Sequence, residues 1–173
     1  MINVLANAPP QASDLAGLVR EHLDELATYA CHLVGNPDDA MEFVAGGIYH
    51  ATKYPPVRLR TDGRAALYRA VTRACRHEHR FPPRGHGPSR LFKRRRHVFA
   101  AEFDGESASR MNTVKRALMS IPMERRAAVL LRDLAKLSYR EMATALECSP
   151  ESAARQLAAS RRDFGAIYRE IAL

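Results

Sequence analysis

The chain has 173 residues, and its hydrophobic share of 46% is enough for a packed core in one ordinary domain or two small ones. Only 7% of the residues are aromatic and there is no Trp, which favours helices packed on helices over a β-sandwich. No apolar run approaches the length of a membrane span, and the first ten residues lack the features of a signal peptide. We therefore expect a cytoplasmic, all-α protein without membrane insertion.

The net charge of +8 is concentrated in one central stretch. Residues 1–57 carry 2 Lys and Arg against 7 Asp and Glu, whereas residues 58–96 carry 13 against 2. Residues 97–173 are close to balance, with 12 against 10. A dense basic stretch is typical of a surface that binds phosphate groups, although a solvated basic linker would have the same composition.

The first predicted domain spans residues 13–80 and follows a loose arm that ends in Pro9-Pro10. Its first helix begins at Ser13 or Asp14, because either side chain can cap it. Apolar residues then recur at helical spacing until Gly35-Asn36-Pro37 stops the helix.

Two more helices complete this domain. The second opens at Asp38 and Asp39 and runs to about Thr52, and Gly46-Gly47 weakens it by roughly 1 kcal/mol per glycine. The third opens at Thr61 or Asp62. Its apolar face consists of Leu67, Ala70, Val71, Ala74 and Cys75.

A basic linker is predicted over residues 81–111, where prolines and glycines break the helical pattern. It has room for one short helical turn at residues 91–101. Because the linker is rich in proline and poor in apolar residues, we expect the domains on its two sides to move independently.

The second predicted domain spans residues 112–173. A helix over 112–120 ends at Ile121-Pro122, and the next runs over 123–136. Its core candidates are Val129, Leu130 and Leu134.

The end of this domain has the pattern of a helix-turn-helix. Ser138 and Glu141 form a capping box at the start of a short helix, and residues 147–149 make a tight turn. Ser149 then caps a long final helix that opens with Pro150. An ordinary helical hairpin has a similar pattern, but a short capped helix, a tight turn and a longer helix describe a helix-turn-helix.

In a helix-turn-helix the first helix braces the second, whose N-terminal residues meet base edges in the major groove. Arg155 could read a guanine and Gln156 an adenine, since both side chains bind bidentately. The exposed positions of the last helix should include Ala159, while Ala153, Leu157 and Phe164 face the core. The DNA-binding candidates of this domain are Ser138, Ser149, Ser152, Arg155, Gln156, Arg161 and Arg162.

The run from Ile121 to Ala143, IPMERRAAVLLRDLAKLSYREMA, resembles the opening of region four of the extracytoplasmic-function (group IV) sigma factors of the sigma-70 family. The parts VLLRDL and LSYREMA match that family nearly residue for residue. The N-terminal half is similar to region two, at residues 27–34 with the following GNPDDA and at Leu67-Tyr68-Arg69. The resemblance covers about residues 15–80 and 112–170, and the linker falls where the family has one.

This resemblance implies that core RNA polymerase and promoter DNA are the partners of the chain, with an anti-sigma factor as a further candidate. Region two would bind the clamp of the largest polymerase subunit and melt the minus-ten element, and region four would bind the flap of the second-largest subunit and read the minus-thirty-five element. The polymerase-binding candidates are Asp39, Glu42, Phe43 and Tyr49. The candidates for a basic groove that captures single-stranded DNA are Arg64, Arg69, Arg73 and Arg76, preceded by Arg58 and Arg60. Tyr68 is interpreted as a packing residue.

The chain departs from the family pattern in both halves. Ala45-Gly46 replaces a Gln-Glu pair of the clamp-binding helix, and Ala66 and Arg73 replace a Trp and an Asn. Ala154 and Ala159 replace basic residues of the recognition helix, so DNA binding should be weaker and less dependent on salt. Two alternatives to a sigma factor therefore stay open. One is a sigma-like interaction protein that holds an anti-sigma factor or another regulator, and the other is a DNA-binding regulator that acts without polymerase.

An enzyme is not expected, and neither is a cofactor. Cys75, His77 and His79, with His86 nearby, form the one cluster with metal-ligand chemistry, but helical residues two apart point to different sides. The three cysteines do not suggest disulfides, and Cys31 and Cys148 are interpreted as buried thiols.

Overall fold

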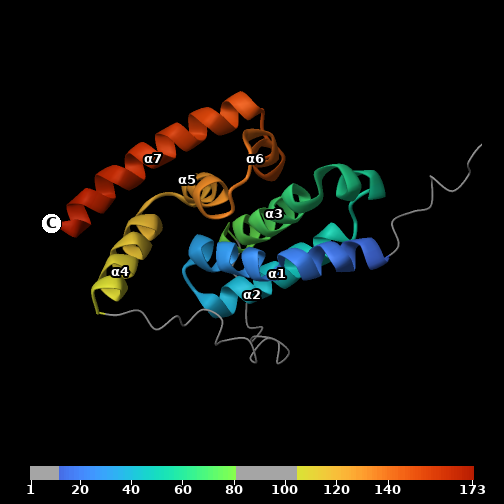
Figure 1. Cartoon of the computed structure of the whole chain (residues 1–173), viewed down its shortest axis with the longest axis horizontal. Helices are drawn as coiled ribbons and strands as arrows, with labels where there is room; N and C mark the ends of the chain where they lie inside the picture. The colour runs from blue at the N-terminus through green and yellow to red at the C-terminus, as the bar shows by residue number, and fades with distance from the viewer. Residues whose placement is uncertain (1–11, 81–104) are drawn as a thin grey trace, which may run out of the picture.

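The computed structural model describes residues 12–80 and 105–173, and every regular element in these two ranges is helical (Figure 1). The all-α fold predicted from the sequence is therefore confirmed. None of the helices in the described ranges has the length and apolarity needed to cross a membrane. The N-terminal arm, the helical turn at residues 91–101 and most of the proposed linker lie outside the described residues. In chain order the elements are α1 (Ala12–Val34), α2 (Pro37–Ala51), α3 (Pro56–Arg80), α4 (Gly105–Ser120), α5 (Met123–Val129), the π-helical segment η3 (Leu130–Leu134), α6 (Tyr139–Leu146) and α7 (Pro150–Ala172).

Helices α1, α2 and α3 pack on one another and form the N-terminal half. Tyr29 and Tyr68 are fully buried between α1 and α3, with their rings edge to face at 5.1 Å. The Tyr29 hydroxyl shares a hydrogen bond of 2.8 Å with Thr72, so this polar group is satisfied inside the core. The interpretation of Tyr68 as a packing residue is thus confirmed.

The start of α3 differs from the prediction. The helix begins at Pro56, several residues before the expected cap at Thr61 or Asp62. Gly63 interrupts it with φ 40° and ψ −111°, a backbone conformation that is not helical. The buried part of α3, from Ala65 onward, therefore begins just after this kink, close to the predicted start.

The C-terminal half is built from α4 to α7, and α4 begins at Gly105 rather than near residue 112. Leu134 was predicted to lie in the core, but its side chain is 39% exposed. The cause is the π-helical turn, in which the Ala135 amide donates to the Leu130 carbonyl five residues back. The extra residue per turn rotates Leu134 outward, and Leu131 and Ala135 are buried instead.

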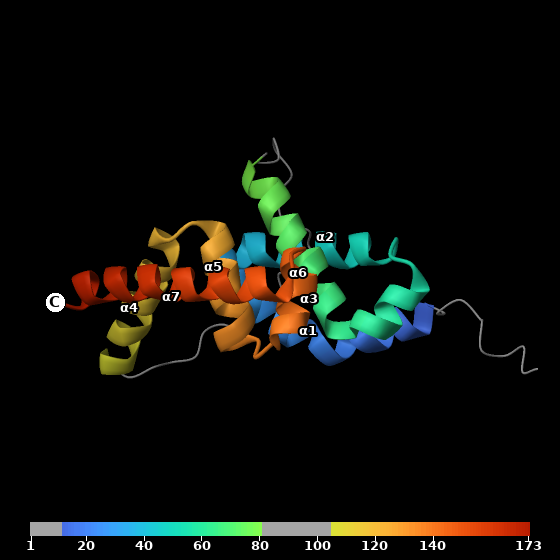
Figure 2. The ribbon, with the colours of Figure 1, turned by 90° about the horizontal axis from the view of Figure 1, so that it is seen from above.

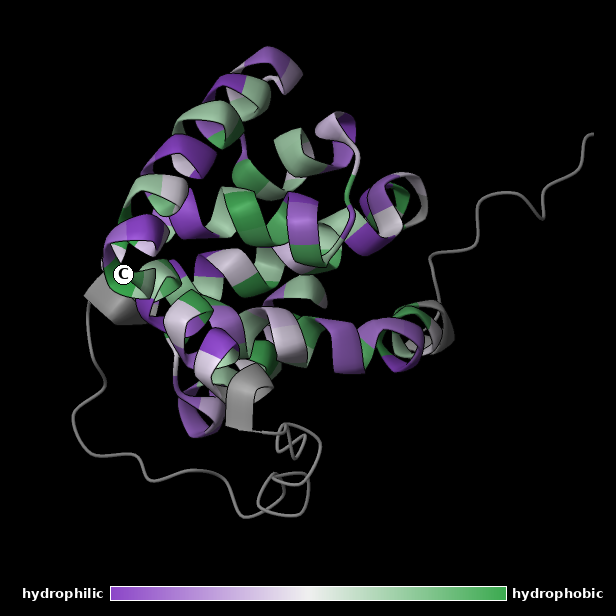
Figure 3. Ribbon diagram, turned by 60° about the vertical axis from the view of Figure 1, so that its left-hand side comes forward, coloured by the Kyte–Doolittle hydropathy of each residue, from purple (hydrophilic) through white to green (hydrophobic). Residues whose placement is uncertain are grey.

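The two halves lie against each other, contrary to the expectation of independent domains. Figures 1 and 2 both show α6 beside α3, and α5 and η3 also contact α1. In Figure 3 the most hydrophobic stretches of ribbon gather where the helices meet, and the purple stretches lie mainly on the outside. The position of α6 over α3 places the helix-turn-helix next to the arginines of the N-terminal half.

Candidate nucleic-acid interface

The helix-turn-helix predicted from the sequence is present, with α6 as its first helix and α7 as its second. Ser138 and Glu141 form the predicted capping box, because the Ser138 side chain accepts from the Glu141 amide and Glu141 accepts from the Ser138 amide at 2.8 Å. The Ser138 hydroxyl, which donates to the Glu141 carboxylate at 2.7 Å, and the Ser138 amide stabilise the charged form and hold the pKa of Glu141 below its usual value. Ser149 caps α7 by accepting from the Ser152 amide, and Pro150 is the first residue of the helix.

The first turns of α7 present the residues proposed to read bases. Arg155 is exposed, and its guanidinium donates to the Ser152 hydroxyl at 3.0 Å. Arg162 is also exposed, two turns further along. Gln156 is half-buried and its amide donates to the Glu124 carbonyl of α5 at 3.2 Å, so it would have to give up this bond to contact an adenine. Ala153 and Leu157 are buried, and the half-buried Phe164 packs against the same core, as predicted.

Arg161 also has a partner within the protein. Its Nε donates to Asp133 of η3 at 3.1 Å, and a second bond joins the same two side chains. The hydrogen bond to Asp133 raises the pKa of Arg161 above its usual value. This pair connects α7 to η3, so the Arg161 guanidinium is already bonded within the protein and is not free to contact DNA.

Arg64, Arg69 and Arg76 of α3 are half-buried beside the C-terminal half, whereas the Arg73 side chain is 69% exposed. Arg69 forms an ion pair with Glu147, the residue that ends α6, and Arg73 lies 4.0 Å from the same carboxylate. Arg64 donates to the Ala135 carbonyl at 2.5 Å and lies 2.9 Å from the Glu25 carboxylate. Arg76 is half-buried and its Nε has no hydrogen-bond partner. The structure thus brings these arginines next to the turn of the C-terminal domain.

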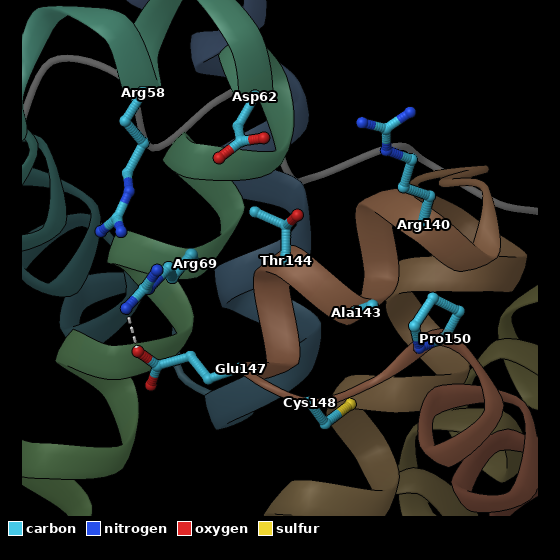
Figure 4. A pocket seen from close by; sticks show the side chains of 9 residues that line it. All are labelled: Arg58, Asp62, Arg69, Arg140, Ala143, Thr144, Glu147, Cys148 and Pro150. Atoms are coloured by element: carbon cyan, nitrogen blue, oxygen red, sulfur yellow. Dashed lines mark hydrogen bonds and ion pairs between the residues drawn. The ribbon is translucent and has the colours of Figure 1, made fainter.

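A polar cavity of about 370 Å³ lies between α3 and the helix-turn-helix (Figure 4). Arg58, Asp62 and Arg69 line it from α3, and Arg140 and Glu147 line it from the other side. The size is that of a small-molecule pocket, far too small for a DNA duplex. Three arginines and two acidic residues line the cavity, and two of them, Arg69 and Glu147, form the ion pair between the two halves. The cavity therefore belongs to the contact between the halves.

The candidate polymerase-binding residues lie on α2. Asp39 is exposed and accepts from the Asn36 side chain at 3.0 Å, next to the cap of the helix. Glu42 is half-buried, and Phe43 packs against the core. Tyr49 is 62% exposed and the Lys53 ammonium lies 4.6 Å from the centre of its ring. Asp39 and Tyr49 therefore lie on the surface, where a protein partner could reach them.

Two residues that the sequence analysis did not single out are prominent here. Glu147 has φ 59° at the end of α6, a left-handed position that usually carries glycine. The sequence shows only that the helix over residues 139–146 is followed by Glu147 instead of the glycine that usually ends a helix in this conformation. Arg126 is the other, and only 8% of it is exposed. Arg126 directly precedes the apolar run AAVLL, and this position in the sequence could have indicated that it is buried.

The cysteine and histidine residues that could bind a metal do not form a site in the described part of the chain. Cys75 is buried in α3, whereas His77 is exposed, and no group of three ligands that could hold a metal occurs among the described residues. His86 lies outside these residues, and nothing is described of the His79 side chain. Cys31 and Cys148 are half-buried, so the prediction of buried thiols was wrong for both. Both side chains nevertheless pack against the hydrophobic core.

The fold and the site together define a helical protein of two packed halves, the second of which is a helix-turn-helix domain. Residues 111–164 match the family model of sigma-70, region 4. The structure is similar to that of the sigma factor RpoE from Bartonella quintana, solved in complex with the anti-sigma factor NepR. That similarity has a TM-score of 0.65 at 15% sequence identity and covers 91% of this chain and 98% of that chain. Comparison with curated protein sequences gave no significant match.

The C-terminal domain is therefore a sigma-70 region 4, and the chain has the fold of an extracytoplasmic-function sigma factor. The match includes the motifs VLLRDL and LSYREMA, so the resemblance of this segment to region four is confirmed. The resemblance of residues 15–80 to region two is consistent with the fold.

Proposed function

We propose that the protein is a sigma factor that binds core RNA polymerase and directs transcription initiation at a small set of promoters. The observation that carries the proposal is the capped helix-turn-helix within residues 111–164, the segment that matches sigma-70 region 4. Region 4 would read the minus-thirty-five element, and the arginines of α3 would capture the melted minus-ten strand. The protein would act in the cytoplasm without catalysis or a cofactor, and the domain boundaries 13–80, 81–111 and 112–173 belong to this proposal.

In this proposal Arg155 and Arg162 contact DNA from the exposed side of α7. Ser138, Ser149 and Ser152 lie at the N-termini of α6 and α7, where free backbone amides and hydroxyls favour phosphate. Gln156 and Arg161 could contact DNA only after exchanging their present partners. On the opposite half, Asp39, Glu42, Phe43 and Tyr49 would contact the polymerase.

The first test is a titration of the purified full chain against core RNA polymerase, followed by transcription of a promoter library with the mixture. Tight binding with transcripts from few promoters is the expected result. Binding without selective transcription would contradict the proposed promoter recognition, and an absence of binding would contradict the proposal as a whole.

Replacing Arg155 by alanine is expected to weaken binding to a promoter selected from that library about tenfold, because one bidentate base contact is worth about 1.4 kcal/mol or more. The control is Arg169→Ala, which removes an exposed arginine from the last turn of the same helix. Both variants lose one positive charge, so a difference between them measures position rather than net charge. Equal losses, measured by fluorescence anisotropy, would rule out Arg155 as a base-reading residue.

A sigma-like interaction protein is the second candidate function. It is favoured by Ala45-Gly46, which replaces the polar pair of the family's clamp-binding helix, and by the packing of the two halves against each other. Such a protein would bind an anti-sigma factor, as the RpoE of the similar structure does, without initiating transcription. A helix-turn-helix regulator that acts without polymerase would instead bind DNA alone, which the titration also distinguishes.

Gly46→Glu is expected to strengthen binding to core polymerase, because it restores the carboxylate that the family has at this position. The backbone position accepts a side chain, since a Cβ at Gly46 would meet no atom within 4 Å. Gly46→Ala is the matched control, because it gives the same gain of helix stability, about 1 kcal/mol, without the charge. Binding measured by biolayer interferometry should improve for the glutamate variant only. Equal binding of both variants would show that this face of α2 does not contact the clamp.

A further inference from the structure

Glu147 stands out because its position in the turn is not explained by local structure. It ends α6 in the left-handed region, with φ 59° and ψ 44°. Helices that end in this way usually have glycine there, because a Cβ is disfavoured in this conformation. The local backbone gives no reason for a glutamate at this position, whereas the contacts of its side chain with the other half do.

The Glu147 carboxylate lies against the arginines of α3. It forms an ion pair with Arg69 and lies 4.0 Å from Arg73, and Figure 4 shows it pointing toward Arg69 across the gap between the two helices. Both arginines are candidates for binding the sugar-phosphate backbone of the melted strand. Glu147 thus holds a carboxylate where that strand would place a phosphate, and the two anions would compete for the same groups.

Other contacts support the same closed arrangement from the opposite end. The Arg126 guanidinium donates to the Leu33 carbonyl of α1 and, at 2.7 Å, to the Leu118 carbonyl of α4. Further bonds reach the carbonyls of Met119 and Ile121. Because the last carbonyls of a helix have no partner within it, one buried cation satisfies the ends of α1 and α4 together. Arg64 adds a third link, to the Ala135 carbonyl.

We infer that Glu147, paired mainly with Arg69 and more weakly with the exposed Arg73, is an internal clasp that holds the two halves closed and occupies Arg69 until nucleic acid displaces it. The inference rests on the proposed function in one respect, namely that these arginines bind DNA. Closure itself is independent of that assumption. When only the open form binds, the apparent dissociation constant equals that of the open form divided by the fraction of molecules that are open. The clasp therefore lowers the DNA affinity of the free protein.

The expected effect is modest, because the Arg69 and Glu147 side chains are 20% and 37% exposed. Partly exposed ion pairs are worth at most about 1 kcal/mol, which corresponds to a change of about two- to fivefold in the closed population. Arg126 and Arg64 would remain in place. The clasp is therefore a bias that a polyanion can overcome rather than a permanent lock.

The test uses the full chain, small-angle X-ray scattering and four variants. Glu147→Gln removes the charge and keeps the shape, and Glu147→Gly also relieves the left-handed backbone, so neither should unfold the domain. Glu170→Gln, at an exposed position near the end of α7, loses the same charge away from the clasp. The fourth variant exchanges the pair, as Arg69→Glu with Glu147→Arg.

The radius of gyration should increase for both Glu147 variants, remain unchanged for Glu170→Gln and return toward the wild-type value in the exchanged pair. No difference between the Glu147 variants and Glu170→Gln would overturn the clasp. Binding of a fluorescent single-stranded oligonucleotide should be about two- to fivefold tighter for Glu147→Gly than for Glu170→Gln. An open chain without tighter binding would overturn the competition with DNA. If wild type and all variants fail to bind DNA, the proposed function fails, while the scattering still decides whether the clasp exists.

Discussion

Replacing Arg126 by methionine is expected to lower the free energy of unfolding by about 3 kcal/mol or more, since hydrogen bonds to charged groups are worth about 1.5–3 kcal/mol each. Methionine fills a comparable elongated space but has no donor, so the carbonyls at the ends of α1 and α4 lose their shared partner. Burial lowers the pKa of the Arg126 guanidinium, which shows that the site penalises the charge and that the hydrogen bonds must compensate. Chemical denaturation followed by far-UV circular dichroism measures the change.

Arg125→Met is the matched control for this prediction. Arg125 precedes Arg126 in the same helix, but it is exposed and its partner is the Asp163 carboxylate at the surface. An ion pair of this kind contributes about 0–1 kcal/mol. Arg126→Lys should fall between the two methionine variants, because an ammonium keeps the charge but not the planar fork of donors. A loss for Arg126→Met no larger than for Arg125→Met would mean that water replaces the guanidinium at these carbonyls.

The helix-turn-helix could be predicted because its determinants are close together in the sequence. Ser138 and Glu141 are three residues apart, and Ser149 directly precedes Pro150. Each pair encodes a helix start through its own hydrogen bonds, whatever the rest of the chain does. The family motif LSYREMA contains Ser138 and Glu141, so the capping pattern and the resemblance both predict a helix-turn-helix.

The contact between the two halves could not be predicted, because its partners are far apart in the sequence. Arg69 and Glu147 are separated by 78 residues, and Arg126 and Leu33 by 93. No periodicity links such residues, and a proline-rich basic segment between them is typical of a flexible linker. The α3 arginines were therefore predicted as a free DNA-binding surface, whereas the structure gives Arg64, Arg69 and Arg73 partners within the protein.

The exposure of Leu134 was missed for a different reason. The prediction assumed α-helical spacing throughout residues 123–136, and the π-helical turn changes that spacing within the helix. The turn is defined by the hydrogen bond from the Ala135 amide to the Leu130 carbonyl, and the spacing of apolar residues in the sequence does not indicate it. Side chains within this turn, such as Arg132, whose guanidinium lies 5.2 Å from the centre of the Tyr139 ring, therefore cannot be placed from α-helical spacing alone.

The glycines of α2 show how one local pattern can have two physical origins. The sequence indicates only that Gly46-Gly47 weakens the helix. In the structure, a Cβ at Gly47 would lie 2.9 Å from both the backbone nitrogen and the Cα of Val71 in α3, whereas one at Gly46 would meet nothing within 4 Å. Gly47 is thus required by the close approach of two helices, and Gly46 is free to change.

Gly47→Val is therefore expected to lower the free energy of unfolding by about 3 kcal/mol, the upper range for adding methyl groups to a well-packed core. Gly46→Val should change it by less than about 0.5 kcal/mol, because valine is a somewhat better helix former than glycine and has open space there. Thermal and chemical denaturation of the two variants provide the measurement. Truncating Val71 to alanine should not rescue Gly47→Val, since the closest atoms belong to the backbone of α3. If Gly47→Val proved as harmless as Gly46→Val, α2 and α3 could separate at little cost. The proposed polymerase-binding surface of α2 would then owe its position to contacts other than this close approach.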